Sequence, residues 1–77
     1  MNISIKYNIG DTVYYADHYD EYIPTGPFII TGIDIKINKE GTRVIYAVEQ
    51  EDDCDLVTER LCFDTYAECT KWCEEHN

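Results

Sequence analysis

Acidic residues are the side chains of this sequence most clearly able to bind a partner or take part in chemistry. Asp and Glu number 16 against six Lys and Arg in 77 residues, a formal net charge of −10 at pH 7. Such a surface repels nucleic acid and anionic lipid and speeds encounter with basic proteins. We therefore expect a basic protein surface as the partner, with no direct binding to nucleic acid or to a membrane. The residues expected to bind it form two stretches: Glu49, Glu51, Asp52, Asp53 and Asp55, and Asp17, Tyr19, Asp20, Glu21 and Tyr22.

Tyrosines add to this binding chemistry, because the sequence has seven of them and two lie within the second acidic stretch. A tyrosine offers a rigid apolar ring with a hydroxyl at its tip, which suits a protein interface. Tyr14, Tyr19 and Tyr22 are the expected exposed contacts.

The four cysteines, Cys54, Cys62, Cys69 and Cys73, raise the question of a metal. Two cysteines four residues apart on a helix can bind zinc, but the C-x7-C-x6-C-x3-C spacing lacks the Cys-x2-Cys pair typical of zinc sites. We favour free thiols that pack as small apolar side chains. A zinc site, or a disulfide from Cys54 or Cys62 to the helix, is the alternative. No cofactor is expected.

Catalytic chemistry has little support in the sequence. His18 lies among carboxylates without a neighbouring nucleophile, and the only serine is Ser4. The acidic stretch lacks the alternating carboxylates and central glycine of an EF-hand loop. A chain this short also has little room for a cleft holding two carboxylates in unlike environments. We expect a protein that is not an enzyme.

Alternation of apolar and polar residues indicates that strands must position these side chains. The clearest hairpin joins residues 28–37 and 42–49 through a turn at residues 38–41. Ile29, Thr31, Ile33, Ile35 and Ile37 are predicted to share one face, with Gly32 marking a bulge. Val44, Tyr46 and Val48 are predicted to face Ile33, Ile35 and Ile37.

The other expected elements are shorter. Thr65 followed by Glu68 fits a capping box and starts a helix over about residues 65–76, packed through Tyr66, Cys69, Trp72, Cys73 and His76. Further strands are expected at residues 3–9, 12–16 and 56–58, a polar loop at 17–26, and an acidic loop at 50–55.

We predict one domain over residues 1–77, mainly β in an α+β class, with a β-barrel over about 1–63 and the helix after it. Without a signal peptide or apolar span we expect a cytoplasmic protein, whose oligomeric state an exposed edge strand leaves open.

Two short motifs carry a resemblance to known proteins. Ile9-Gly10-Asp11-Thr12-Val13-Tyr14-Tyr15 resembles the opening of SH3-like and KOW/Tudor-like barrels, and residues 58–65 with the following helix resemble the ending of short phage and Firmicutes proteins. The resemblance implies a small five-stranded SH3-like barrel with a C-terminal helix. The loops at 17–27 and 50–55 depart from this pattern, so we expect specific function there.

The resemblance to phage proteins leads to a sharper hypothesis. Many anti-CRISPR proteins are similarly small and acidic, and some occupy sites meant for DNA. The chain would then be a phage-encoded inhibitor of a nucleic-acid-binding host defence protein, acting in the host cytosol, with the carboxylates of residues 49–55 replacing phosphates. The alternatives are an SH3- or Tudor-like adaptor that binds a peptide through a Tyr-rich groove, and a zinc-stabilised mini-domain.

Overall fold

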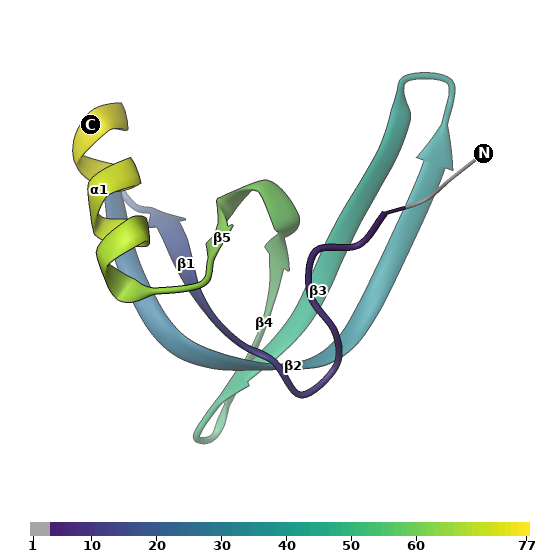
Figure 1. Cartoon of the computed structure of the whole chain (residues 1–77), viewed down its shortest axis with the longest axis horizontal. Helices are drawn as coiled ribbons and strands as arrows, with labels where there is room; N and C mark the ends of the chain where they lie inside the picture. Colours follow the sequence, from purple (N-terminus) through teal and green to yellow (C-terminus); the bar gives the residue numbers. More distant parts are fainter. Residues whose placement is uncertain (1–3) are drawn as a thin grey trace.

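The protein is mainly β in the computed structural model, which describes residues 4–77 (Figure 1). Five antiparallel strands form one sheet of order β4-β3-β2-β1-β5, and one α-helix follows them. The elements are β1 (Thr12–His18), β2 (Tyr22–Asn38), β3 (Gly41–Gln50), β4 (Asp53–Thr58), the 3-10 helix η1 (Glu59–Leu61), β5 (Cys62–Phe63) and α1 (Tyr66–His76). Among residues 4–77, no helix combines the length and the apolar character that crossing a bilayer requires.

The long strand β2 organises the sheet because its two ends pair with different partners. Its first part, up to Ile29, pairs with β1, and its second part, from Ile29 to Asn38, pairs with β3. β2 therefore curves strongly between the two halves (Figure 1). η1 connects β4 to β5, which pairs with β1 at the opposite edge of the sheet.

The bulge expected at Gly32 is present, and it changes which side chains face the core. The register between β2 and β3 shifts between Ile30 and Gly32, which leaves Thr31 as an extra residue on β2. Because side chains alternate along a strand, one extra residue moves all later ones to the other face. Ile30 before the bulge and Ile33 after it therefore both contact the core, whereas Ile29 is 53% exposed. The prediction that residues 29–37 present one continuous odd-numbered face was wrong for this reason.

The hairpin between β2 and β3 is confirmed. Asn38 pairs with Gly41, the Asn38 side chain accepts a hydrogen bond from the backbone N–H of Glu40 at 2.8 Å, and Gly41 has φ +132°. A positive φ favours glycine, so the turn depends on this residue. Tyr46 lies opposite Ile33 and Val44 opposite Ile35, both within the sets predicted to face each other, whereas Val48 lies opposite Ile30 and Ile37 opposite Thr42.

Both predicted loops are instead hairpins. Residues 17–26 continue β1 and start β2, and only residues 19–21 form the tip. Pro24 is tolerated in β2 because β3 pairs only from Ile29 onward, so a missing N–H can face the open side. Likewise, the 50–55 segment is a two-residue turn at Glu51-Asp52, where Glu51 has φ +55°, and β4 starts at Asp53. Polar composition suggested loops, but pairing with the neighbouring strand determined the backbone conformation.

The N-terminal segment was also predicted wrongly. Residues 4–9 are not a strand, and Ile3 lies outside the described residues. Side chains rather than a strand hold the backbone: the N–H of Lys6 donates to the Glu59 carboxylate at 3.0 Å, and that of Tyr7 to the Tyr46 hydroxyl at 3.1 Å. Apolar alternation thus reflected only the burial of Tyr7 in the core.

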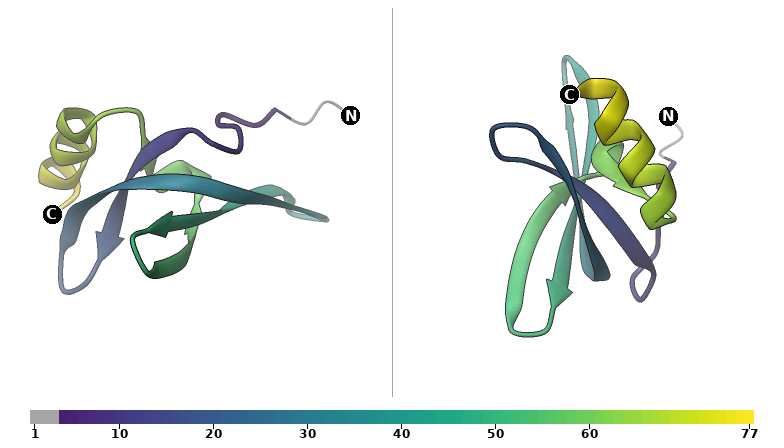
Figure 2. Two further views of the ribbon diagram at one scale, coloured as in Figure 1. Left: turned by 90° about the horizontal axis from the view of Figure 1, so that it is seen from below. Right: turned by 90° about the vertical axis from the view of Figure 1, so that its left-hand side faces the viewer.

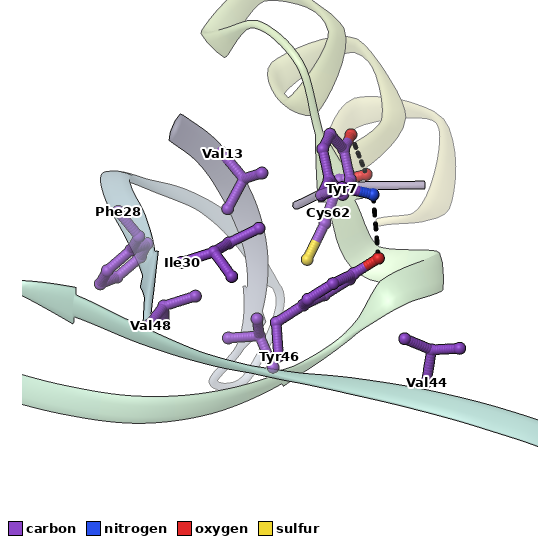
Figure 3. Close-up of a cluster of buried hydrophobic side chains, with 9 residues drawn as sticks. Tyr7, Val13, Phe28, Ile30, Val44, Tyr46, Val48 and Cys62 are labelled. Carbon is purple, nitrogen blue, oxygen red and sulfur yellow. Dashed lines mark hydrogen bonds between the residues drawn. The ribbon is translucent and has the colours of Figure 1, made fainter. Parts of the chain in front are cut away.

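Two buried clusters hold the fold together. The first lies on the inner face of the sheet (Figure 3) and consists of Tyr7, Val13, Phe28, Ile30, Val44, Tyr46, Val48, Val57 and Cys62. The second lies under α1 and consists of Ala16, Leu61, Cys69 and Cys73, flanked by Tyr14, Tyr15, Tyr22, Phe63 and Trp72.

The helix α1 is defined by local sequence and fixed by aromatic contacts. The Thr65 hydroxyl caps it by accepting from the N–H of Glu68 at 3.1 Å, as predicted. Trp72 meets the Tyr22 ring at 4.7 Å between centroids. The Asn77 side chain accepts from the N–H of Tyr22 at 2.6 Å and donates to its C=O at 3.0 Å. Together these contacts attach the end of the chain to the β1–β2 hairpin.

Candidate partner-binding surface

The β3–β4 hairpin carries five exposed carboxylates. Strand register places Glu49 opposite Cys54, Asp55 opposite Val48, and Asp53 opposite Gln50. Glu49 therefore projects from one face of the hairpin, and Asp53 and Asp55 from the other. Glu51 and Asp52 form the turn itself. The acidic residues predicted at 49–55 are thus gathered on both faces and the tip of one projection, which we call the acidic hairpin (residues 49–55).

A hollow of about 410 Å³ adjoins one side of the acidic hairpin. Its apolar lining comes from Pro27 and Ile29, and its acidic lining from Glu49 and Glu51, with Thr12 and Gln50 completing it. Ile29 reaches this position because it lies opposite both Thr12 and Glu49 in the sheet. The hollow thus combines an apolar wall with carboxylates, a lining that suits the aliphatic stem and charged head of a lysine or arginine.

The second predicted stretch lies at the other hairpin, between β1 and β2. Tyr19, Asp20 and Glu21 form its exposed tip, and Tyr19 is 75% exposed. Tyr22 is half-buried instead of exposed, because its ring packs against Trp72 and against His18, each at 4.7 Å between centroids. Asp17 is also half-buried. This stretch therefore offers a smaller exposed surface than predicted.

The two stretches do not form one site. β2 is next to both hairpins, but the β1–β2 tip lies at its start at Tyr22, while the acidic hairpin lies beside Ile29. Tyr22 and Ile29 are seven positions apart on β2, roughly 23 Å along the strand. Figure 2 shows the two hairpins as separate projections. A partner that contacts both must be large.

The cysteines are distributed across the molecule. Cys54 is exposed on β4, with its Sγ 3.7 Å from a Glu49 carboxylate oxygen, whereas Cys62, Cys69 and Cys73 are buried free thiols. Within residues 4–77, no three His, Cys, Asp or Glu side chains gather as a metal site would need. Burial raises the pKa of the Cys62 and Cys69 thiols to about 12, so both are protonated at neutral pH.

Thiol accessibility is a direct test of this arrangement. With an aromatic disulfide reagent at pH 8, we expect only Cys54 to react in the folded protein, and the three buried thiols to react after unfolding in denaturant. Cys54→Ala should abolish the fast phase. Fast reaction of further thiols in that variant, with its circular dichroism unchanged, would contradict the described burial.

Two features were missed by the sequence analysis. One is a partly buried polar network in which the Tyr46 hydroxyl donates to the Glu59 carboxylate at 2.5 Å (Tyr46 itself is shown in Figure 3). The other is the exposure of Ile29 beside the acids. The bulge at Gly32 was the available signal for the exposure of Ile29. No local sequence pattern predicts the contact between Tyr46 and Glu59.

Comparisons with protein families, with curated proteins and with solved structures give no match for this chain.

Proposed function

We propose that this protein is a non-enzymatic binding protein whose acidic hairpin engages a basic protein surface. The observation that carries the proposal is the grouping of five exposed carboxylates on one projection beside an apolar hollow. All six Lys and Arg of the sequence lie outside residues 49–55, so these charges have no cationic neighbour on their own hairpin. Opposite charge on a partner would accelerate association and fix its orientation.

Recognition would combine charge with apolar contact. A partner Lys or Arg would lay its methylene groups against Ile29 and Pro27 and place its charged head near Glu49 and Glu51. Glu51, Asp52 and Asp53 at the tip would meet further cations. The sharper form of the proposal is a phage-encoded inhibitor in which these carboxylates occupy the phosphate positions of a nucleic-acid-binding host defence protein.

The fold we propose for this role is an SH3-like barrel with a C-terminal helix. Two features support it: β2 is bent and shared between both halves of the sheet, and η1 joins β4 to β5. We favour the acidic hairpin over a Tyr-rich groove as the binding surface. Tyr14 packs against Tyr66 at 5.8 Å between ring centroids, and Tyr22 packs under α1, so neither is freely presented.

Charge reversal at the tip tests the proposed surface. Once a basic partner has been identified by crosslinking, Asp52→Lys with Asp53→Lys should weaken its binding at least about tenfold, because attraction becomes repulsion. The dissociation constant is measured by titration calorimetry at low and high salt, and the wild-type affinity should fall as salt rises.

The matched control is Glu74→Lys with Glu75→Lys, which makes the same change in net charge on the exposed part of α1. It should alter affinity only about two- to threefold through the long-range field. Equal losses in both variants would show that net charge alone acts, and unchanged affinity after reversal at the tip would exclude the acidic hairpin. If the protein is the proposed phage-encoded inhibitor, it must also displace DNA from its partner.

A further inference from the structure

The first residues of β3 form a free sheet edge. β3 starts at Gly41, but its pairing with β4 starts only at Ile45, opposite Thr58. Residues 42–44 therefore have β2 on one side and, within residues 4–77, no strand on the other. Backbone groups along such an edge can pair with an extended peptide that joins the sheet as an additional strand.

A groove of about 690 Å³ runs along this edge. η1 forms its other side, since the chain turns away from the sheet after β4 and passes beside β3 (Figure 1). Val44, Ile45 and Leu56 give the groove apolar lining, and Leu56 is 68% exposed. An extended segment would therefore find apolar contacts for some of its side chains next to the unpaired backbone.

The groove is cationic in an otherwise acidic protein. Arg43 and Arg60 are the two arginines of the sequence, and both line it, one from β3 and one from η1. Among residues 4–77, its single acid is Glu59, which already accepts hydrogen bonds from the Tyr46 hydroxyl at 2.5 Å and the Lys6 N–H at 3.0 Å. The other described residues that line the groove are uncharged, so the lining within residues 4–77 carries an excess of one positive charge. Guanidinium groups bind carboxylates through paired hydrogen bonds.

We infer that this groove binds an extended peptide carrying an acidic side chain, which pairs with residues 42–44 as an added strand and sets its carboxylate against Arg43 and Arg60. A peptide fits better than a nucleic acid, because the edge offers backbone groups and the net charge of −10 repels a polyanion. This site is independent of the acidic hairpin and has the opposite preference in charge. The protein would then join a basic partner to an acidic segment.

The test uses the intact chain and an array of nonapeptides with Glu at the central position and apolar, β-branched or polar residues elsewhere. A second array carries Gln at the same position. We expect binding to be enriched in the Glu array. For the best Glu peptide, Arg43→Gln and Arg60→Gln should each raise the dissociation constant at least about tenfold, measured by fluorescence anisotropy.

Three controls make the result specific. Lys71→Gln removes the same charge from the exposed part of α1 and should change the dissociation constant less than about twofold. Asp52→Lys with Asp53→Lys should retain peptide binding, which separates this inference from the proposed function. N-methylation of alternate peptide amides should abolish binding, since it blocks strand pairing. Equal binding of the Glu and Gln arrays, or equal effects of Arg43→Gln and Lys71→Gln, would overturn the inference.

Discussion

Replacing Tyr46 with alanine is expected to remove about 3–5 kcal/mol of folding free energy, the range for deleting a buried aromatic side chain. Tyr46 is 0% exposed and lies at the centre of the first cluster. Its ring packs edge-on against Tyr7 at 5.7 Å between centroids. A domain of this length is stable by roughly 4–12 kcal/mol, so the variant loses a large fraction of its total stability. Urea unfolding, followed by circular dichroism, measures the loss.

A second variant separates packing from polar contacts. Tyr46→Phe retains the ring but removes the hydroxyl that donates to Glu59 and accepts from the Tyr7 N–H. Leaving the buried Tyr7 N–H and the half-buried Glu59 carboxylate without this partner should cost about 1–3 kcal/mol. Tyr19→Ala, at an exposed tip, should change stability by less than about 0.5 kcal/mol. If Tyr46→Phe were as stable as the wild type, the network would contribute nothing, and the N-terminal segment would need another anchor.

Trp72 makes the same experiment a test of cooperativity. It is the only tryptophan and lies in the second cluster, away from Tyr46. Its fluorescence should change at the same urea concentration as the circular dichroism if both clusters unfold together.

The parts of the fold that were predicted correctly depend on residues close together in the sequence. Thr65 and Glu68 define the start of α1, and Asn38 with Gly41 defines a hairpin turn. Each requires only a few neighbouring side chains and a backbone angle. Cysteine burial under α1 also followed from spacing, because Cys69 and Cys73 lie on one face of a helix.

The parts of the fold that were predicted incorrectly depend on pairing partners that are distant in the sequence. Pairing with β1 turned a polar, proline-containing stretch into a strand, and the bulge at Thr31 reversed the faces of β2. For the candidate surface, the acids were identifiable from composition, but their position beside Ile29 required the register of three strands. Arg43 and Arg60 are 17 residues apart and line one groove only because β4 ends where η1 begins.

Alkaline pH should destabilise the protein progressively above about pH 9, because its buried thiols and tyrosines resist ionisation. Burial, followed by the hydrogen bond to Glu59, raises the pKa of Tyr46 to about 12 from its ordinary 10.0. Burial likewise raises the pKa of Cys62 and Cys69 to about 12 from 9.0, and that of Tyr7, to which neighbouring Asp64 also contributes. Each group stays protonated in the folded chain at a pH where the unfolded chain has already lost the proton.

Proton linkage gives the direction in which the free energy of unfolding changes with pH. Between pH 9 and 12 the folded state binds more protons than the unfolded state, so the free energy of unfolding falls as pH rises, and it is fully retained below pH 9. The urea midpoint should therefore be constant from pH 7 to 8.5 and decline steadily above pH 9, with a cooperative rise in tyrosinate absorbance as the fold is lost. Measurements at about 0.5 M salt limit general charge repulsion.

Paired cysteine variants identify the groups responsible for the decline. Replacing Cys62, Cys69 and Cys73 with alanine removes the three buried thiols and leaves the buried tyrosines, so the decline should start near pH 10 instead of pH 9, the ordinary pKa values of the two side chains. Cys54→Ala, at an exposed thiol, should leave the onset unchanged. If the variant without the buried thiols began to lose stability at the same pH as the wild type, ionisation of those thiols would not limit the fold. The tyrosine network around Tyr46 would then be the sole determinant of its alkaline limit.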